Sequence, residues 1–153
     1  MGREKKRRIA ATGRWLPVPL EFLRSRACAE MSPHAAKLLF DLLGQMGPTC
    51  SGNGDLSISP KALAARGWAS RASLQQATRE LHEHGLIVVT RRGSRTACQL
   101  FAVTLFPLDC DQSKLDIRPG AYTHLEFMQG ENRNANPPTD ADPAQWRRAR
   151  KLN

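Results

Sequence analysis

The chain has 153 residues, and its 23 Lys and Arg outnumber its 14 Asp and Glu, which gives a formal net charge of +9 and a pI near 10.1. This length suits one domain and excludes large catalytic architectures such as an α/β barrel. Residues 1–14 carry +5 and residues 146–153 carry +4, so residues 15–145 are neutral in sum. Within that neutral body, residues 61–95 carry +5 between flanks of slight negative charge.

The cysteines and the start of the chain indicate the cellular compartment, which we expect to be reducing. Cys28, Cys50, Cys98 and Cys110 include no C-x-x-C pair, which fits neither a zinc ligand set nor a dense disulfide framework. The basic start is not followed by an apolar run of seven or more, and no run approaches 18 apolar residues. We therefore expect a cytoplasmic protein with reduced thiols, no export signal and no membrane contact.

The first part of the chain predicts an arm and two helices. Residues 1–14 are polar, basic and without period, which is typical of a flexible arm. Apolar spacing predicts a helix over residues 20–29. Ser32 and Pro33 then form a good N-cap and first-turn pair for a helix of about 14 residues. We expect residues 15–106 to form one domain.

The next forty residues alternate helix and strand signals. Residues 56–58 read as a short strand, and Ser59 and Pro60 begin a brief helix that Gly67 stops. Ser70 is a third N-cap, for a helix over residues 71–84 whose buried face would carry Leu74, Ala77 and Leu81. Trp68 links the two helices, and we expect its ring to fill the core behind the turn. Leu38, Leu42 and Ile87 are also expected core residues by periodicity.

A hairpin and a weakly patterned end complete the chain. Residues 86–90 and 97–106 are β-rich runs around the polar turn 91–96, which contains Gly93. Residues 107–130 are expected to be a C-terminal extension, with a strand or short packing segment over 115–129. Residues 131–153 are predicted to be a disordered tail with a basic end.

A short helix, a glycine turn and a longer capped helix form a helix-turn-helix, and the second helix of such a motif fits the major groove of DNA. The positions of this helix that face away from the core hold Arg and Gln, which make bidentate contacts to guanine and adenine. Serines at its start suit phosphate, and arginines in the hairpin turn suit phosphates or the minor groove. The candidate DNA-binding residues are Ser70, Arg71, Ser73, Gln75, Gln76, Arg79, Arg91, Arg92 and Arg95.

The run LSISPKALAARGWASRASL at residues 56–74, continued by Glu80-Leu81 and Gly85-Leu86-Ile87, resembles winged-helix DNA-binding domains. The group it resembles most is found in bacterial regulators and in replication or maintenance proteins of plasmids, phages and other mobile elements. The resemblance covers roughly residues 32–106. It implies an α+β winged helix that binds double-stranded DNA through its second helix and wing, often as a homodimer. Trp68 is bulkier than usual for the turn, and no effector-binding domain follows, which makes a ligand-sensing regulator a poorer fit.

The sequence also has features of two other functional classes. A winged helix can instead dock a partner protein in a replication, partition or secretion complex, with residues 96–145 or Trp146 as the contact. The enzyme interpretation rests on His82, His84 and Tyr122, which resemble in outline the metal motif and nucleophile of rolling-circle nucleases. Two histidines two residues apart on a helix face different ways, so we expect no enzyme, no metal and no cofactor.

Overall fold

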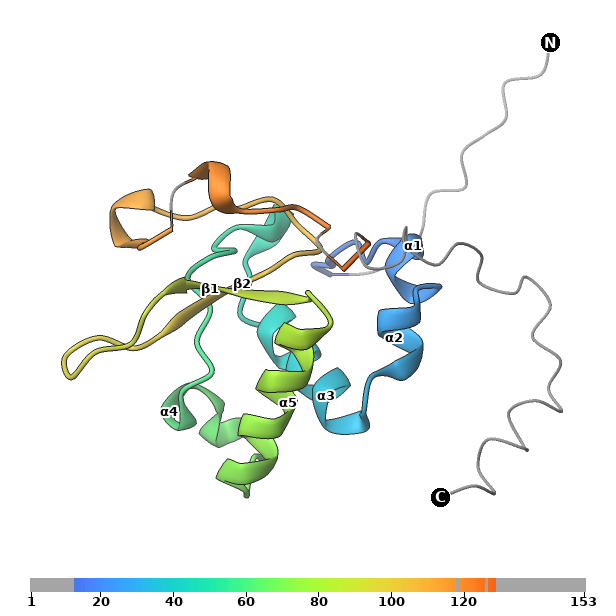
Figure 1. Cartoon of the computed structure of the whole chain (residues 1–153), viewed down its shortest axis with the longest axis horizontal. Helices are drawn as coiled ribbons and strands as arrows, with labels where there is room; N and C mark the ends of the chain where they lie inside the picture. The colour runs from blue at the N-terminus through green and yellow to red at the C-terminus, as the bar shows by residue number, and fades with distance from the viewer. Residues whose placement is uncertain (1–12, 118, 126, 129–153) are drawn as a thin grey trace, which may run out of the picture.

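The computed structural model describes residues 13–117, 119–125 and 127–128, and it combines helices with one small antiparallel sheet (Figure 1). Expectations for residues 1–12, which make up most of the basic arm, and for the tail 131–153 lie outside the described residues. The α-helices and strands are α1 (Leu20–Leu23), α2 (Arg26–Glu30), α3 (Pro33–Leu43), α4 (Pro60–Leu63), α5 (Arg71–Glu83), β1 (Ile87–Arg91) and β2 (Leu100–Val103). Single 3-10 turns are η1 (Pro48–Cys50), η2 (Ala64–Arg66), η3 (Gln112–Lys114) and η4 (Pro119–Ala121).

Serine hydroxyls start the three helices of the central region, as predicted. Ser32, Ser59 and Ser70 accept the backbone N–H three residues on, at 3.2 Å in each case, and so satisfy an orphan donor of the first turn. The helix after Ser32 is shorter than the expected 14 residues. It has 11, because Gly44 caps its C-terminus and Met46 packs into the core from the loop that follows.

The single helix predicted over residues 20–29 is wrong, because two short helices occupy this stretch. The hydroxyl of Ser25 donates to the Phe22 carbonyl at 2.7 Å and accepts from the Cys28 N–H at 3.1 Å. It therefore ends α1 and caps α2 at the same time. The serine side chain offers nearby backbone groups hydrogen bonds that replace those of a continuous helix.

The hairpin forms where it was predicted, but its strands have different bounds. β1 and β2 pair antiparallel with Ile87 opposite Val103, and a register shift falls between Val89 and Arg91. The strand expected at 56–58 reduces to one bridge between Leu56 and Phe101. The side-chain amide of Gln45 bonds both the N–H and the carbonyl of Ser57, each at 2.9 Å, and so replaces further strand pairing.

The strand expected over residues 97–106 ends at Val103 because its last residues turn away from β1. The amide nitrogen of Asn53 donates to the carbonyls of Val103, Phe106 and Pro107, and its oxygen accepts the Val103 N–H. Asn53 is fully buried, so one side chain replaces the missing ladder partners of this turn.

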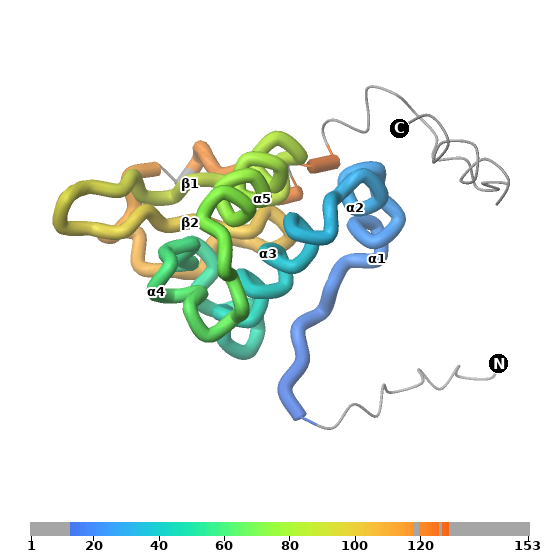
Figure 2. The backbone as a smooth tube through the Cα atoms, turned by 90° about the horizontal axis from the view of Figure 1, so that it is seen from below, coloured from blue at the N-terminus to red at the C-terminus, as the bar shows by residue number. Residues whose placement is uncertain are grey.

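The core lies where α3 and α5 cross beneath the sheet. Leu38 and Leu42 of α3 and Leu81 of α5 are fully buried. Ile87 of β1 is only 1% exposed. These were expected core positions, and Leu74 and Ala77 join them. Figure 2 shows α3 between α5 on one side and the segment that precedes α1 on the other.

Residues after Pro107 pack on this core without forming a further strand in the described part of the chain. The hydroxyl of Tyr122 donates to the carbonyls of Val103 and Phe106, and the Leu125 N–H donates to the Thr104 carbonyl at 2.7 Å. The ring of Phe127 meets that of Phe22 edge-on, with centroids 5.7 Å apart. Of the two forms expected for residues 115–129, this is the short packing segment.

Candidate nucleic-acid interface

The helix α5 divides sharply into a buried and an exposed face. Leu74, Ala77 and Leu81 are buried against α3 and the sheet. The side chains expected to face outward are all exposed: Arg71, Gln75, Gln76 and Arg79. The sequence pattern therefore predicts correctly that these four polar side chains lie on the exposed face of α5. This helix has 13 residues.

The turn before α5 is built by one glycine and one tryptophan. Gly67 has φ +77°, a left-handed conformation that suits glycine, and it ends the α4–η2 segment. Trp68 is half-buried against the core, as expected of a ring behind the turn. Its indole N–H also donates to the Asp41 carboxylate at 2.6 Å, a contact that the sequence did not reveal.

Asp41 of α3 accepts three side-chain hydrogen bonds, two of which come from the segment that ends in the turn before α5. Besides Trp68, its carboxylate accepts from Lys37 Nζ at 2.7 Å and Arg66 Nε at 2.8 Å, and its side chain is only 3% exposed. Burial raises the pKa of this carboxyl, but the hydrogen bonds outweigh burial and the pKa lies below its usual value. The spacing of Lys37 and Asp41 is visible in the sequence, whereas their partners on the turn are not.

A hollow of about 300 Å³ separates the start of α5 from the hairpin. Arg71 and Gln75 line it from the helix, and Cys98 and Gln99 line it from the hairpin. The helix and the hairpin thus form one concave surface with polar side chains on both walls. Sequence reasoning missed Cys98 and Gln99 on this surface, because only the folded hairpin brings them to face α5.

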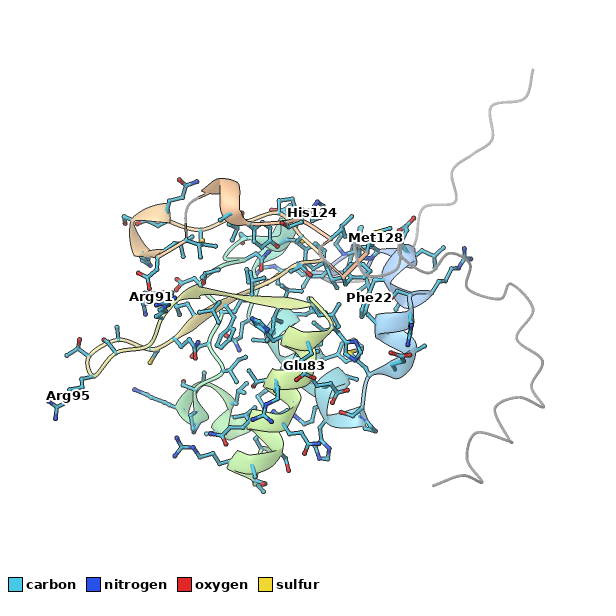
Figure 3. All side chains as sticks on the ribbon, in the orientation of Figure 1. Phe22, Glu83, Arg91, Arg95, His124 and Met128 are labelled. Atoms are coloured by element: carbon cyan, nitrogen blue, oxygen red, sulfur yellow. The ribbon has the colours of Figure 1, made fainter. Side chains whose placement is uncertain are left out.

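The arginines of the hairpin turn have different environments. The guanidinium of Arg91 donates to the Cys98 carbonyl from Nε at 3.2 Å and from Nη2 at 2.9 Å, so it braces the two arms. Arg92 is exposed, and its backbone N–H donates to the Asp116 carboxylate at 2.7 Å. Arg95 is exposed at the far end of the loop (Figure 3).

The two serines of the predicted site lie at the start of α5 with unequal exposure. Ser70 is exposed and its oxygen accepts the Ser73 N–H, while Ser73 is half-buried. Ser70 therefore has the more accessible hydroxyl of the two.

Of the acidic side chains near this surface, Glu83 is exposed at the far end of α5, and four others lie on the other side of the hairpin or turn inward. Asp109, Asp111 and Asp116 are exposed on the segment that runs on the opposite side of the hairpin from α4 and α5 (Figure 1). Glu80 of α5 turns toward α3, where its carboxylate accepts the Ser32 hydroxyl at 2.6 Å. The exposed face of α5 near its start is therefore free of carboxylates.

Tyr122, the nucleophile of the enzyme interpretation, bonds to the main chain. Tyr122 donates its hydroxyl to two main-chain carbonyls, as described above. Among the described residues, no group of three His, Cys, Asp or Glu could hold a metal ion. No helix in that part of the chain is long and apolar enough to cross a bilayer.

Comparison with known proteins adds no relative to this picture. No protein-family model, no curated protein and no solved structure matches the chain.

Proposed function

We propose that residues 32–106 form a winged helix that binds double-stranded DNA in a sequence-specific manner, with α5 in the major groove. The observation that carries this proposal is the exposed polar face of α5, which shares one hollow with the hairpin. The role we propose for such binding is transcriptional control, or the replication and maintenance of a plasmid, phage or other mobile element.

The order of elements supports this fold. A packing helix α3, the bridge at Leu56, the short helix α4, the Gly67 turn, α5 and the β1–β2 hairpin follow one another as in a helix-turn-helix with a wing. The 13 residues of α5 extend about 20 Å, and a helix fits within the roughly 12 Å width of the major groove.

The side chains on α5 match the donors that read base edges. Arg71 and Arg79 would pair with the O6 and N7 acceptors of guanine, and Gln75 and Gln76 with N6 and N7 of adenine. Ser70, at the capped start of the helix, is suited to a phosphate oxygen. Because the helix begins next to the hollow, a duplex seated on α5 also reaches the hairpin.

The hairpin is proposed to hold the backbone or the minor groove. Arg95 and Arg92 extend from its exposed turn and would contact phosphates. Arg91 would act indirectly, since its bonds to the Cys98 carbonyl keep the two arms together. The carboxylates of Asp109, Asp111 and Asp116 lie on the side that would face away from DNA.

A salt titration of DNA affinity tests the proposal. If six to eight basic side chains engage phosphates, a plot of log K against log salt has a slope of about −5 to −7. Arg95→Ala should make the slope shallower by about 1 unit, whereas Gln112→Ala, on the other side of the hairpin, should leave it unchanged. A slope near zero would overturn the proposal and favour a winged helix that docks a protein.

A further inference from the structure

A second hollow, of about 410 Å³, lies between the segment that precedes α1 and the end of α3. Two exposed aromatic rings line it, those of Trp15, 61% exposed, and Phe40, 65% exposed. The rest of the lining is mainly apolar and includes Leu16, Val18, Leu43 and Met46. This hollow shares no residue with the one beside α5, and the segment that carries Trp15 lies on the side of α3 opposite to α5 (Figure 2). It is therefore a surface separate from the proposed duplex-binding face.

The two exposed rings offer flat apolar faces to a ligand. Aromatic rings associate with other flat rings in offset-stacked arrangements, and nucleobases stack on Trp and Phe side chains in the same way. The bases of a duplex already stack on one another, so a base that is free to stack on protein comes from a single strand. A volume within the roughly 300–1,000 Å³ range of small-ligand sites suits planar groups of this size.

The charge around the hollow is positive. Arg14 lines it, is exposed, and forms no ion pair within the described part of the chain. By sequence, residues 1–14 carry +5 and lead directly into Trp15. No acidic residue of the described ranges lines the hollow. Cations beside exposed rings complement a strand whose bases are flat and whose phosphates are negative.

Phe40 also borders a third hollow, of about 550 Å³, which Lys37 and Arg66 line. Both of these side chains are exposed, whereas the Asp41 carboxylate that pairs with each of them is buried. The charge that a ligand would meet there is therefore positive as well. A base stacked on Phe40 would have Arg14 available for a phosphate in one hollow, and Lys37 and Arg66 for a phosphate in the other.

We propose that Trp15 and Phe40 form a second nucleic-acid site, which binds single-stranded DNA by stacking bases on both rings. Arg14, Lys37 and Arg66 hold the phosphates of that strand. An anionic membrane also attracts basic and aromatic side chains, but it takes up the apolar face of an amphipathic helix, whereas these two rings line a hollow. The site goes beyond the proposed duplex binding by α5 and does not rest on it.

Fluorescence anisotropy of a labelled oligothymidylate of about 15 nucleotides, titrated with the full chain, tests the site. Trp15→Leu and Phe40→Leu keep an apolar side chain but remove the ring, so each should weaken binding about 5- to 100-fold. Trp15→Phe keeps a ring and should retain most of the affinity. Leu23→Ala is the matched control, because Leu23 is an exposed apolar residue that does not line the hollow. The substituted side chains are exposed, so far-ultraviolet circular dichroism should show unchanged folding.

A parallel titration with duplex DNA separates this site from α5. Trp15→Leu and Phe40→Leu should leave duplex affinity unchanged, whereas Gln75→Ala should weaken duplex binding and leave oligothymidylate binding unchanged. A chain that binds the oligothymidylate through these rings but binds no duplex would overturn only the proposal for α5. No oligothymidylate binding at roughly 100 µM protein would overturn the inference, as would binding that is insensitive to both leucine substitutions. Binding to phosphatidylserine vesicles in place of the oligothymidylate would assign the rings to a membrane surface and would also overturn it.

Discussion

Ser32 and Glu80 join the start of α3 to the last turn of α5, although 48 residues separate them in the sequence. Glu80 accepts both the backbone N–H and the hydroxyl of Ser32, while the same hydroxyl caps α3 by accepting the Ala35 N–H. One carboxylate thus holds the helix that carries the proposed base contacts against the helix that supports it.

Glu80→Ala should lower the free energy of unfolding by about 1–3 kcal/mol, because it removes hydrogen bonds to a charged, half-buried group. Urea unfolding followed by circular dichroism measures this. Glu83→Ala is the matched control, since Glu83 is exposed on the same helix and should change stability by no more than about 0.5 kcal/mol. Equal effects of the two substitutions would contradict the assigned role of Glu80.

Asp41 should make stability depend on acid pH. Because hydrogen bonds from Lys37, Trp68 and Arg66 hold its folded-state pKa below the unfolded value near 4, the ionised carboxylate stabilises the fold above about pH 4. This contribution is lost as the pH falls through the folded-state pKa. The difference in unfolding free energy between wild type and Asp41→Asn should therefore be largest near neutral pH and shrink toward pH 3. A difference that is constant over this range would show that ionisation of Asp41 is not involved.

Asn53→Asp should destabilise the protein by roughly 3 kcal/mol or more at neutral pH. The substitution replaces an amide that donates to three carbonyls with a buried carboxylate facing the same oxygens. The loss should decrease in acid, where the new carboxyl is protonated and can donate again. Gln112→Glu makes the same chemical change on an exposed residue and should be nearly neutral in thermal unfolding.

Gln75→Ala and Arg79→Ala should each cost about 1–3 kcal/mol of affinity on a cognate site and less on random duplex, if they read bases. A cognate site comes from selecting bound sequences out of a random duplex pool, and fluorescence anisotropy then measures both affinities. His82→Ala, exposed near the other end of α5, is the control. Losses of the same size on both DNAs would assign Gln75 and Arg79 to the phosphate backbone.

The features predicted correctly from the sequence depend on neighbours a few residues away. Ser32, Ser59 and Ser70 were identified as caps because each bonds an N–H three residues on, and the two faces of α5 follow from helical periodicity alone. The prediction of one helix over residues 20–29 was wrong because apolar spacing carries no information about the hydrogen bonds of the Ser25 hydroxyl.

The features that escaped prediction depend on distant partners. Asn53 bonds carbonyls about 50 residues on, and Gln45 takes both backbone groups of Ser57, so neither contact has a local signal. In the sequence Arg91 cannot be distinguished from the other arginines of the turn. Only the folded hairpin brings the Cys98 carbonyl within hydrogen-bonding distance of its guanidinium. For the candidate site, sequence therefore identified the helix surface but missed Cys98, Gln99 and the inward turn of Glu80.

The hairpin also carries a natural attachment point for a chemical probe. Cys98 is exposed in the wall of the hollow beside α5, whereas Cys28, Cys50 and Cys110 are partly covered and burial raises the pKa of each of their thiols. Thiol reagents attack the thiolate, so a maleimide dye should label Cys98 first and leave the other three cysteines largely unmodified. A dye at that position would lie in the concave surface between α5 and the hairpin. Its fluorescence emission should therefore change when a ligand occupies that surface.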